Sequence, residues 1–245
     1  MKIIIFSIGC MLFLLLGFGD NPVSGEENND KTDQFRALRK LMVKNQIQAR
    51  GVTDKHVLAA LQKVERHRFV PEKYQDQAYE DHPLPIGEGQ TISQPYIVGL
   101  MTSLTNPDST KTVLEIGTGS GYQAAVLAEI CKFVYTIEVI PSLGKNAEHL
   151  LNDLGYNNLK VRIGDGYKGW KEFAPFDAIV VTCAPSHVPE PLKNQLKEGG
   201  KMVIPVGKRF MQYLKVLTKR QGKIVEDSII PVRFVPMMDE RGGKY

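Results

Sequence analysis

Val113-Leu114-Glu115-Ile116-Gly117-Thr118-Gly119-Ser120-Gly121 is the stretch that decides the fold. An apolar strand ends here in a glycine-rich turn, and helical spacing resumes directly after it. Glycine lets the chain turn tightly and lets backbone N–H groups approach a ligand closely. The dinucleotide fingerprint requires glycine at its sixth position, which is Tyr122 here, and no Gly-Lys-Ser/Thr phosphate loop is present. This disfavours a nicotinamide dehydrogenase, while the loop taken alone is equally consistent with a structural turn.

Strands and helices alternate along the chain from Thr112 onward. Strands that are apolar throughout, separated by helical stretches, indicate a parallel sheet with both faces covered. The last two apolar segments are joined by a short polar turn, which predicts antiparallel strands at one edge. We therefore expect a doubly wound α/β fold with a mainly parallel, seven-stranded sheet. The expected strands are Thr112–Ile116, Phe133–Glu138, Leu159–Ile163, Ala178–Thr182, Lys201–Val206, Phe210–Thr218 and Ile224–Phe234, and the expected helices cover about 121–130, 142–154 and 188–197.

The residues before this sheet differ in character. From Asp33 to Leu61 apolar residues recur at helical spacing, so we expect N-terminal helices, interrupted at Gly51. Residues 69–99 are irregular and rich in proline and glycine, and so long a loop inside a compact domain is usually functional or disordered. One domain is expected over 31–245, with a helical part that carries a substrate and cofactor loop (31–110), a cofactor-binding core (111–207), and antiparallel strands with a tail (208–245).

The first 30 residues pose a separate question. Ile3 to Phe18 are uncharged and follow Lys2, and a polar tract begins at Gly25. This order is typical of a secretory signal, so residues 1–25 predict an exported, periplasmic or envelope-associated protein. An uncleaved membrane anchor, a misassigned start codon and a cytoplasmic location stay open as alternatives. We leave residues 1–30 out of the domain, as an apolar leader and a polar linker.

Composition limits the classes of function. The chain has 245 residues, 42% of them hydrophobic, and a net charge of +4 without a block of lysines or arginines. Such a charge distribution gives no support to nucleic-acid binding. The three cysteines form no Cys-x-x-Cys pair and no cluster with histidine, so we expect neither a metal site nor disulfides.

Two acidic residues follow the glycine loop at the ends of successive strands. Glu138 ends the next strand, 21 residues after Gly117, where a carboxylate can accept both ribose hydroxyls of a nucleoside. Asp165, followed by Gly166, comes at the end of the strand after that, where a carboxylate can meet an adenine amino group. Because such sheets bind ligands at the carboxyl ends of their strands, these features together predict an adenosine site.

The glycines at 117, 119 and 121, between Glu115 and Glu138, resemble the loop of class I S-adenosylmethionine-dependent methyltransferases. A narrower resemblance, to the protein-L-isoaspartate (D-aspartate) O-methyltransferase family, spans about 33–240. It implies a Rossmann-like methyltransferase fold. The stretches that carry it are Arg68-Phe69-Val70-Pro71, Gln90-Thr91-Ile92-Ser93-Gln94-Pro95-Tyr96, Gly164-Asp165-Gly166 with Gly169-Trp170, Phe176-Asp177-Ala178-Ile179, Gly199–Gly207 and Val232-Arg233-Phe234-Val235-Pro236.

The family resemblance also implies a reaction and a site. The reaction is methyl transfer from S-adenosylmethionine to the α-carboxyl of L-isoaspartyl residues, with D-aspartyl residues as a further acceptor, in damaged proteins and peptides. A monomer is expected. The implied catalytic residue is Ser93, whose alternative role is an ST-turn or an N-cap of the helix after it. The candidate cofactor-binding residues are Gln90, Thr91, Ile92, Ser93, Glu115, Gly117, Thr118, Gly119, Gly121, Glu138, Asp165 and Gly166.

Several readings stay open on the residues alone. A class I methyltransferase for another acceptor would share the glycine loop and Glu138, and a non-catalytic nucleoside-binding module would keep the fold as a scaffold. We expect Glu115 to hold the glycine loop through backbone N–H groups. The tail from Met237 to Gly243 either closes over the cofactor or frays.

Overall fold

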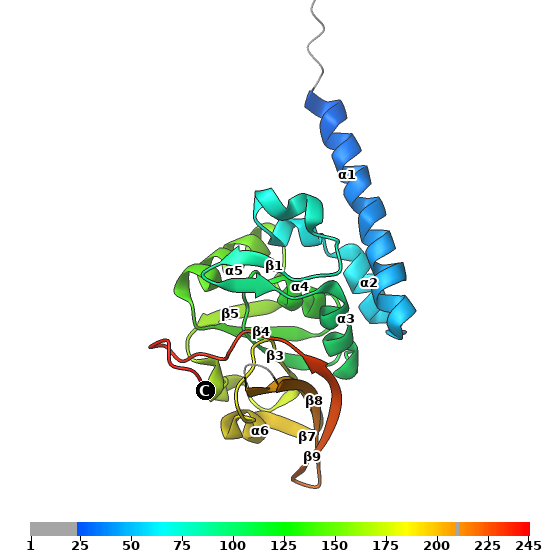
Figure 1. The fold of residues 1–245 in the computed structure, drawn as a ribbon. Coiled ribbons are helices and arrows are strands. Elements are labelled where there is room, and N and C mark those ends of the chain that lie inside the picture. Colours follow the sequence, from blue (N-terminus) through cyan, green and yellow to red (C-terminus); the bar gives the residue numbers. More distant parts are fainter. Residues whose placement is uncertain (1–23, 209–210) are drawn as a thin grey trace, which may run out of the picture.

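The computed structural model describes residues 24–208 and 211–245. At its centre lies a seven-stranded sheet with the strand order β5-β4-β3-β6-β7-β8-β9 (Figure 1). Strands β3 to β7 run parallel, and β8 runs antiparallel to both of its neighbours. The predicted fold class is confirmed. The strands are β3 Thr112–Ile116, β4 Phe133–Glu138, β5 Leu159–Ile163, β6 Phe176–Val181, β7 Leu196–Lys208, β8 Met211–Arg220 and β9 Lys223–Val232.

The sheet is covered on both faces, as its apolar strands predict. In β3, Val113 packs into one hydrophobic cluster, with the N-terminal helices and α4. Leu114 and Ile116 pack into a second cluster on the opposite face, which also contains Trp170. Because successive side chains of a strand point to opposite faces, one short strand contributes to both layers. Trp170 is therefore a packing residue.

Helices surround the sheet (Figure 1). Asp54 caps the N-terminus of α2. Its carboxylate accepts hydrogen bonds from the backbone N–H groups of His56 and Val57 at 2.9 and 3.1 Å, as an N-cap side chain should. The α-helices are α1 Ser24–Leu41, α2 Lys55–Lys63, α3 Pro95–Leu104, α4 Tyr122–Ala128, α5 Pro141–Asp153 and α6 Glu190–Gln195. Shorter turns are η1 Met42–Ile47, η2 Gln48–Arg50, η3 Arg66–Phe69, η4 Glu72–Gln77, η5 Gly166–Lys168 and η6 Lys171–Phe173.

Helix α1 extends away from the rest of the domain (Figure 1). It begins at Ser24, so the polar tract that we treated as a linker is helical. The apolar leader lies outside the described residues. Within residues 24–208 and 211–245, no helix is long and apolar enough to cross a bilayer.

A small hairpin corrects the expectation that 69–99 is irregular throughout. Strands β1 Leu84–Gly87 and β2 Gln90–Ile92 pair antiparallel, with Leu84 opposite Ile92. Glu88 and Gly89 form the turn and both have positive φ, which suits a two-residue hairpin. Ile86 of β1 approaches Gly119, so the hairpin lies against the glycine loop.

Candidate functional site

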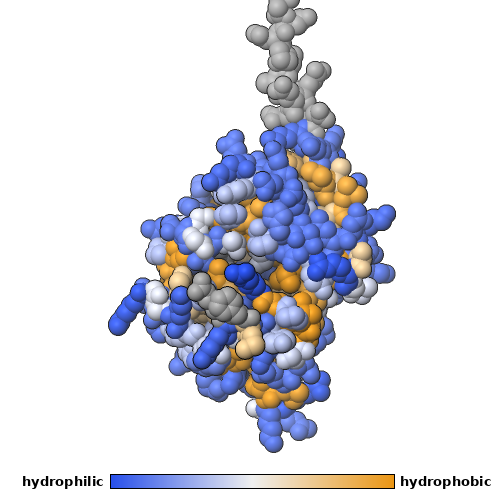
Figure 2. Space-filling view, in the orientation of Figure 1, coloured by the Kyte–Doolittle hydropathy of each residue, from blue (hydrophilic) through white to orange (hydrophobic). Residues whose placement is uncertain are grey.

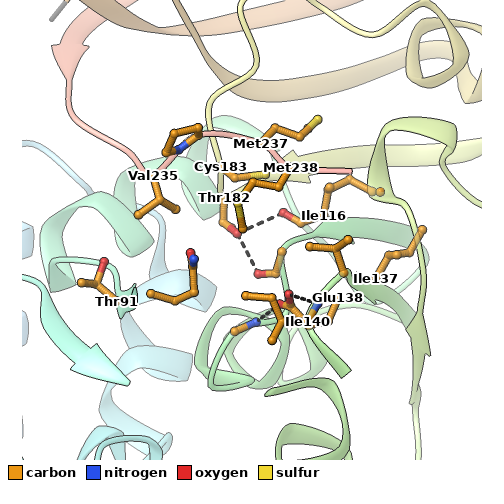
Figure 3. Close-up of a pocket in the computed structure, with 16 residues that line it drawn as sticks. Thr91, Ile116, Ile137, Glu138, Ile140, Thr182, Cys183, Val235, Met237 and Met238 are labelled. Carbon is orange, nitrogen blue, oxygen red and sulfur yellow. Dashed lines mark hydrogen bonds between the residues drawn. The ribbon is translucent and has the colours of Figure 1, made fainter. Parts of the chain in front are cut away.

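A pocket lies at the carboxyl ends of β3, β4 and β6. It is enclosed by the glycine loop, by the hairpin strand β2 and by the C-terminal tail, three segments far apart in the sequence. In Figure 3, Glu138 lies on the opposite side of the pocket from Met237 and Met238. The lining residues are Gln90, Thr91, Ile116, Gly117, Gly119, Ile137, Glu138, Val139, Ile140, Gly166, Thr182, Cys183 and Val235 to Met238.

The first glycine of the loop can only be glycine. Gly117 has φ +97°, and a Cβ atom there would collide with Thr182 Oγ1. The Thr182 hydroxyl donates to the carbonyl oxygen of Gly117 at 2.7 Å and lies 3.0 Å from that of Ile116. On the other side, the Gly117 N–H donates to Ile137 O at 2.8 Å. Both neighbouring strands thus fix the loop, and its bare Cα atoms leave room for a ligand.

Glu138 faces this loop from the end of β4. It is only 5% exposed, its Oε2 accepts the Gly119 N–H at 2.7 Å, and its Oε1 accepts the Ile140 N–H at 3.0 Å. Burial raises the pKa of Glu138, and these backbone N–H groups oppose the rise. A carboxylate offers about four lone-pair positions. Two therefore remain for a diol, so the residues present fit the ribose of a nucleoside cofactor.

Glu115 acts differently from our expectation. Its Oε2 accepts the Thr136 hydroxyl at 2.5 Å, and the Thr118 hydroxyl lies 2.6 Å from that of Thr136. Glu115 alternates with Ile116 along β3, so its side chain lies on the other face of the strand from the pocket. The loop N–H that we assigned to Glu115 is held by Glu138 instead.

The environment of Glu115 changes its protonation. The residue is fully buried, and its Oε1 has no hydrogen-bond partner among the described residues. Burial raises the pKa of Glu115 to about 8, with the nearby Glu138 adding to the rise and the Thr136 hydroxyl opposing it. Glu115 is therefore mostly neutral at pH 7.

Asp165 lies beside the pocket, and its neighbour Gly166 is part of the lining. The carboxylate accepts the Tyr167 N–H at 3.0 Å and the Tyr245 hydroxyl at 2.7 Å, and Lys168 Nζ lies 3.2 Å away. The rings of Tyr167 and Tyr245 stack with their centroids 4.1 Å apart. The tail thus docks on Asp165, the residue that we expect to bind adenine. The contact between Asp165 and adenine stays a prediction.

Ser93 opens into a neighbouring groove of about 560 Å³ rather than into the pocket itself. Its hydroxyl makes no hydrogen bond to any described residue, and the N-cap of α3 is Gln94. The capping role that we considered for Ser93 is therefore absent. Instead, the backbone of Ser93 is fixed, because Nη2 of the fully buried Arg66 donates to Ser93 O at 2.8 Å. Arg66 Nε donates to Ala78 O at 2.7 Å.

The pocket and the groove meet at three residues, Thr91, Thr182 and Val235, which line both. Figure 3 places Thr91 and Val235 on the same side of the pocket. A ligand in the pocket and a second molecule in the groove would therefore touch there. This arrangement suits transfer of a group from one to the other.

The structure brings together half of the candidate residues as pocket lining: Gln90, Thr91, Gly117, Gly119, Glu138 and Gly166. Ile92, Thr118 and Gly121 are buried beside it, and Ser93, Glu115 and Asp165 lie as described above. Sequence reasoning missed Val139, Ile140, Thr182, Cys183, Val235 and Pro236. Thr182 directly follows β6, so the strand-end argument used for Glu138 could have found it. The tail residues give no periodic signal.

Comparison with known sequences points in the same direction. The profile of the family described as protein-L-isoaspartate(D-aspartate) O-methyltransferase matches residues 37–242. The protein-L-isoaspartate O-methyltransferase 1 of Nitrosospira multiformis is 58% identical over 214 residues, which cover 86% of this chain and 89% of that protein. The protein-L-isoaspartate O-methyltransferase of a Picosynechococcus species is 55% identical over 216 residues, 88% of this chain and 97% of that protein.

Solved structures are similar as well. A protein-L-isoaspartate O-methyltransferase superposes with a TM-score of 0.76 at 30% identity, covering 85% of this chain and 67% of that one. A Plasmodium falciparum protein described as a protein-L-isoaspartate O-methyltransferase, in complex with S-adenosyl-L-homocysteine, superposes with a TM-score of 0.70 at 25% identity, covering 83% and 97%.

Proposed function

This chain belongs to the protein-L-isoaspartate(D-aspartate) O-methyltransferase family, and from that premise we propose how its own residues carry out the reaction. It is a protein repair methyltransferase that uses S-adenosylmethionine and acts on isoaspartyl-containing proteins. When bound, this cofactor supplies a methyl group on a positively charged sulfur, which becomes a neutral thioether. The roles of individual residues, the wider choice of acceptor and the location of the enzyme are our proposals.

The pocket binds the nucleoside end of the cofactor through Glu138. Its carboxylate, already oriented by the N–H groups of Gly119 and Ile140, accepts the two ribose hydroxyls. Asp165, next to Gly166, accepts a hydrogen bond from the adenine amino group. The backbone of Gly117 and Gly119 lies against the amino-acid end of the cofactor.

The groove binds the acceptor beside Ser93. Carboxyl groups of this kind have an ordinary pKa of about 3.3–3.9, so the acceptor is ionised at neutral pH and needs no general base. Ser93 donates a hydrogen bond to one carboxylate oxygen and leaves the other to take the methyl group. Positioning two reacting groups in line can contribute about 7–11 kcal/mol in favourable cases. The backbone nitrogen of the following residue then attacks the methyl ester, which releases methanol and closes a succinimide. Hydrolysis of the succinimide returns part of the product to normal aspartyl.

The observation that carries this proposal is the junction of pocket and groove at Thr91, Thr182 and Val235. Its test is a transfer assay with cofactor labelled at the methyl group and two peptides that differ only in an isoaspartyl or a normal aspartyl residue. We expect label in the isoaspartyl peptide alone. Equal labelling of both peptides, or of neither, would contradict the proposal. A D-aspartyl peptide as a third arm measures the wider choice of acceptor.

We propose that the enzyme acts as a monomer, and one chain by itself supplies a lining for both the pocket and the groove. Light scattering should give the mass of one chain. Nucleic acid is not a partner, in keeping with the net charge of +4; adding RNA should leave peptide methylation unchanged.

Location is the least constrained part of the proposal. Residues 1–25 have the composition of an export signal, whereas S-adenosylmethionine is made in the cytosol and a bilayer opposes passage of its charge. We propose an exported or envelope-associated enzyme on the strength of the leader, against the cytoplasmic alternative. An intact Met1 in the soluble cytosolic fraction of fractionated cells would contradict export.

A further inference from the structure

The groove beside Ser93 continues into a second hollow of about 640 Å³. The two share a wall that includes Thr91, Arg233 and Phe234. Figure 2 shows a hollow in this face of the molecule, bordered by strongly hydrophilic and hydrophobic residues together. The combined space can hold several side chains of an extended peptide in addition to the residue that is methylated.

Three cations line the second hollow: Lys208 at the end of β7, Arg233 after β9, and Lys244 in the tail. None of their side chains forms an ion pair or hydrogen bond within residues 24–208 and 211–245. Neither hollow has an aspartate or glutamate in its lining, as far as the described residues go. We call this surface, defined by Lys208, Arg233 and Lys244, the basic groove.

The other cation of the groove is compensated. Arg50 forms an ion pair with Asp81 at 2.9 Å, and its guanidinium lies 3.5 Å from the centre of the Tyr96 ring. The excess charge is thus confined to the basic groove. Apolar walls such as Phe234 and Val235 strengthen the field of these cations, because a hollow with walls of low dielectric focuses field lines.

The position of the cations indicates which part of a substrate they meet. Ser93 and Lys208 line different hollows, and so do Ser93 and Lys244. The acceptor carboxylate lies at Ser93 in the proposed function. Lys208 and Lys244 therefore face the residues that flank the damaged one, whereas Arg233 lines the hollow of Ser93 as well as the second hollow. Flanking residues with negative charge would complement these cations.

We propose that the basic groove selects damaged segments in which aspartate or glutamate side chains flank the isoaspartyl residue. This inference rests on the proposed function and adds a substrate class to it. A polynucleotide is a poorer match, because its phosphates would need a longer basic track than these cations provide.

The test uses three isoaspartyl peptides of equal length, with glutamate, glutamine or lysine as the flanking residues. We expect kcat/KM to be highest for the glutamate peptide and lowest for the lysine peptide, with the gap narrowing at high ionic strength as charges are screened. Arg233→Gln and Lys208→Gln should each reduce the ratio of glutamate-peptide to glutamine-peptide activity by about two- to fivefold. Lys223→Gln removes the same charge at the far end of β9 and should leave that ratio unchanged.

Equal kcat/KM for the three peptides at low ionic strength would overturn the inference, as would an unchanged ratio in both groove variants. The glutamine peptide separates this failure from a failure of the proposed function. If wild-type enzyme methylates the glutamine peptide, the repair activity is confirmed regardless of how the flanking residues affect kcat/KM. If no isoaspartyl peptide is labelled, the proposed function itself fails.

Discussion

The cofactor pocket and the acceptor groove adjoin each other, yet they are built differently. The floor of the pocket consists of backbone groups and a buried carboxylate at the ends of central strands, with Gly117 and Glu138 fixed by bonds to their neighbours, and β2 and the tail close over it. The groove is lined mainly by residues outside the central strands, from η2, the loop before α3, α3 itself, β9 and the segment after it. The sheet itself therefore determines the cofactor site, whereas the acceptor site can change without disturbing the core. Substitutions in the two regions should have different consequences.

The largest effect should come from the pocket. Glu138→Ala removes a carboxylate that would accept two ribose hydroxyls, and hydrogen bonds to charged groups contribute about 1.5–3 kcal/mol each. We expect affinity for S-adenosylhomocysteine to fall by about a hundredfold or more, measured by calorimetric titration. The control is Glu148→Ala on the exposed side of α5. Unchanged affinity in a folded Glu138 variant would remove this residue from the site.

Gly117→Ala should cost stability as well as binding. An alanine at position 117 would have a strained φ, and its Cβ would collide with Thr182. Together these two effects should lower the free energy of unfolding by about 2–4 kcal/mol in urea titrations. Gly51→Ala is a matched control, because Gly51 has a similar φ of +92° but nothing within 4 Å of the added atom. If both variants lose the same stability, the contact with Thr182 is unimportant.

Glu115 should make stability depend on pH. Its pKa rises from 4.5 to about 8 on folding, so between these values the folded state binds more protons than the unfolded state. The contribution of Glu115 to the free energy of unfolding is fully present below pH 4.5. It falls as pH rises towards 8, by up to about 1.4 kcal/mol per pH unit. Urea unfolding at pH 5, 6 and 7 should show this slope in the wild type relative to Glu115→Gln. Parallel pH profiles would contradict a buried, protonated Glu115.

The smallest effect should come from the groove. Ser93→Ala removes one hydrogen bond to the acceptor, worth about 0.5–1.5 kcal/mol, so turnover should fall by about three- to tenfold. Cofactor affinity should not change, because the hydroxyl faces the groove and not the pocket. Ser103→Ala in α3 is the control. Equal losses of turnover and cofactor affinity would place Ser93 in the cofactor pocket instead.

The same contrast explains what could be predicted from the sequence. The bounds of β3, β4 and β5 are as predicted, because an apolar strand between turn residues gives a clear pattern. Strand β6 begins two residues earlier than expected, at Phe176, and β7 extends to Lys208 because it pairs with β8 from Lys201 to Lys208.

The hairpin β1–β2 was missed because both strands are very short and β1 contains proline and glycine. Val235 and Pro236 were missed as pocket lining because long-range docking, not local periodicity, places them there. Of the two alternatives for the tail from Met237, the structure favours closure, because Met237 and Met238 line the pocket. Arg66 fixes Ser93 by donating a hydrogen bond to the Ser93 carbonyl oxygen. Nothing in the sequence pattern distinguishes this buried arginine from the exposed ones.

The account depends most on the claim that the methyl group crosses at the junction of pocket and groove, which Thr91, Thr182 and Val235 line. The most direct test is a crystal structure with S-adenosylhomocysteine and an isoaspartyl peptide, in which the distance from the cofactor sulfur to the nearest α-carboxylate oxygen is measured. We predict the sulfur at the Thr91 end of the pocket, with its methyl position about 3–3.5 Å from an oxygen that lies near Ser93. A cofactor bound with its adenine at Thr91, or a carboxylate far from that end, would contradict the account.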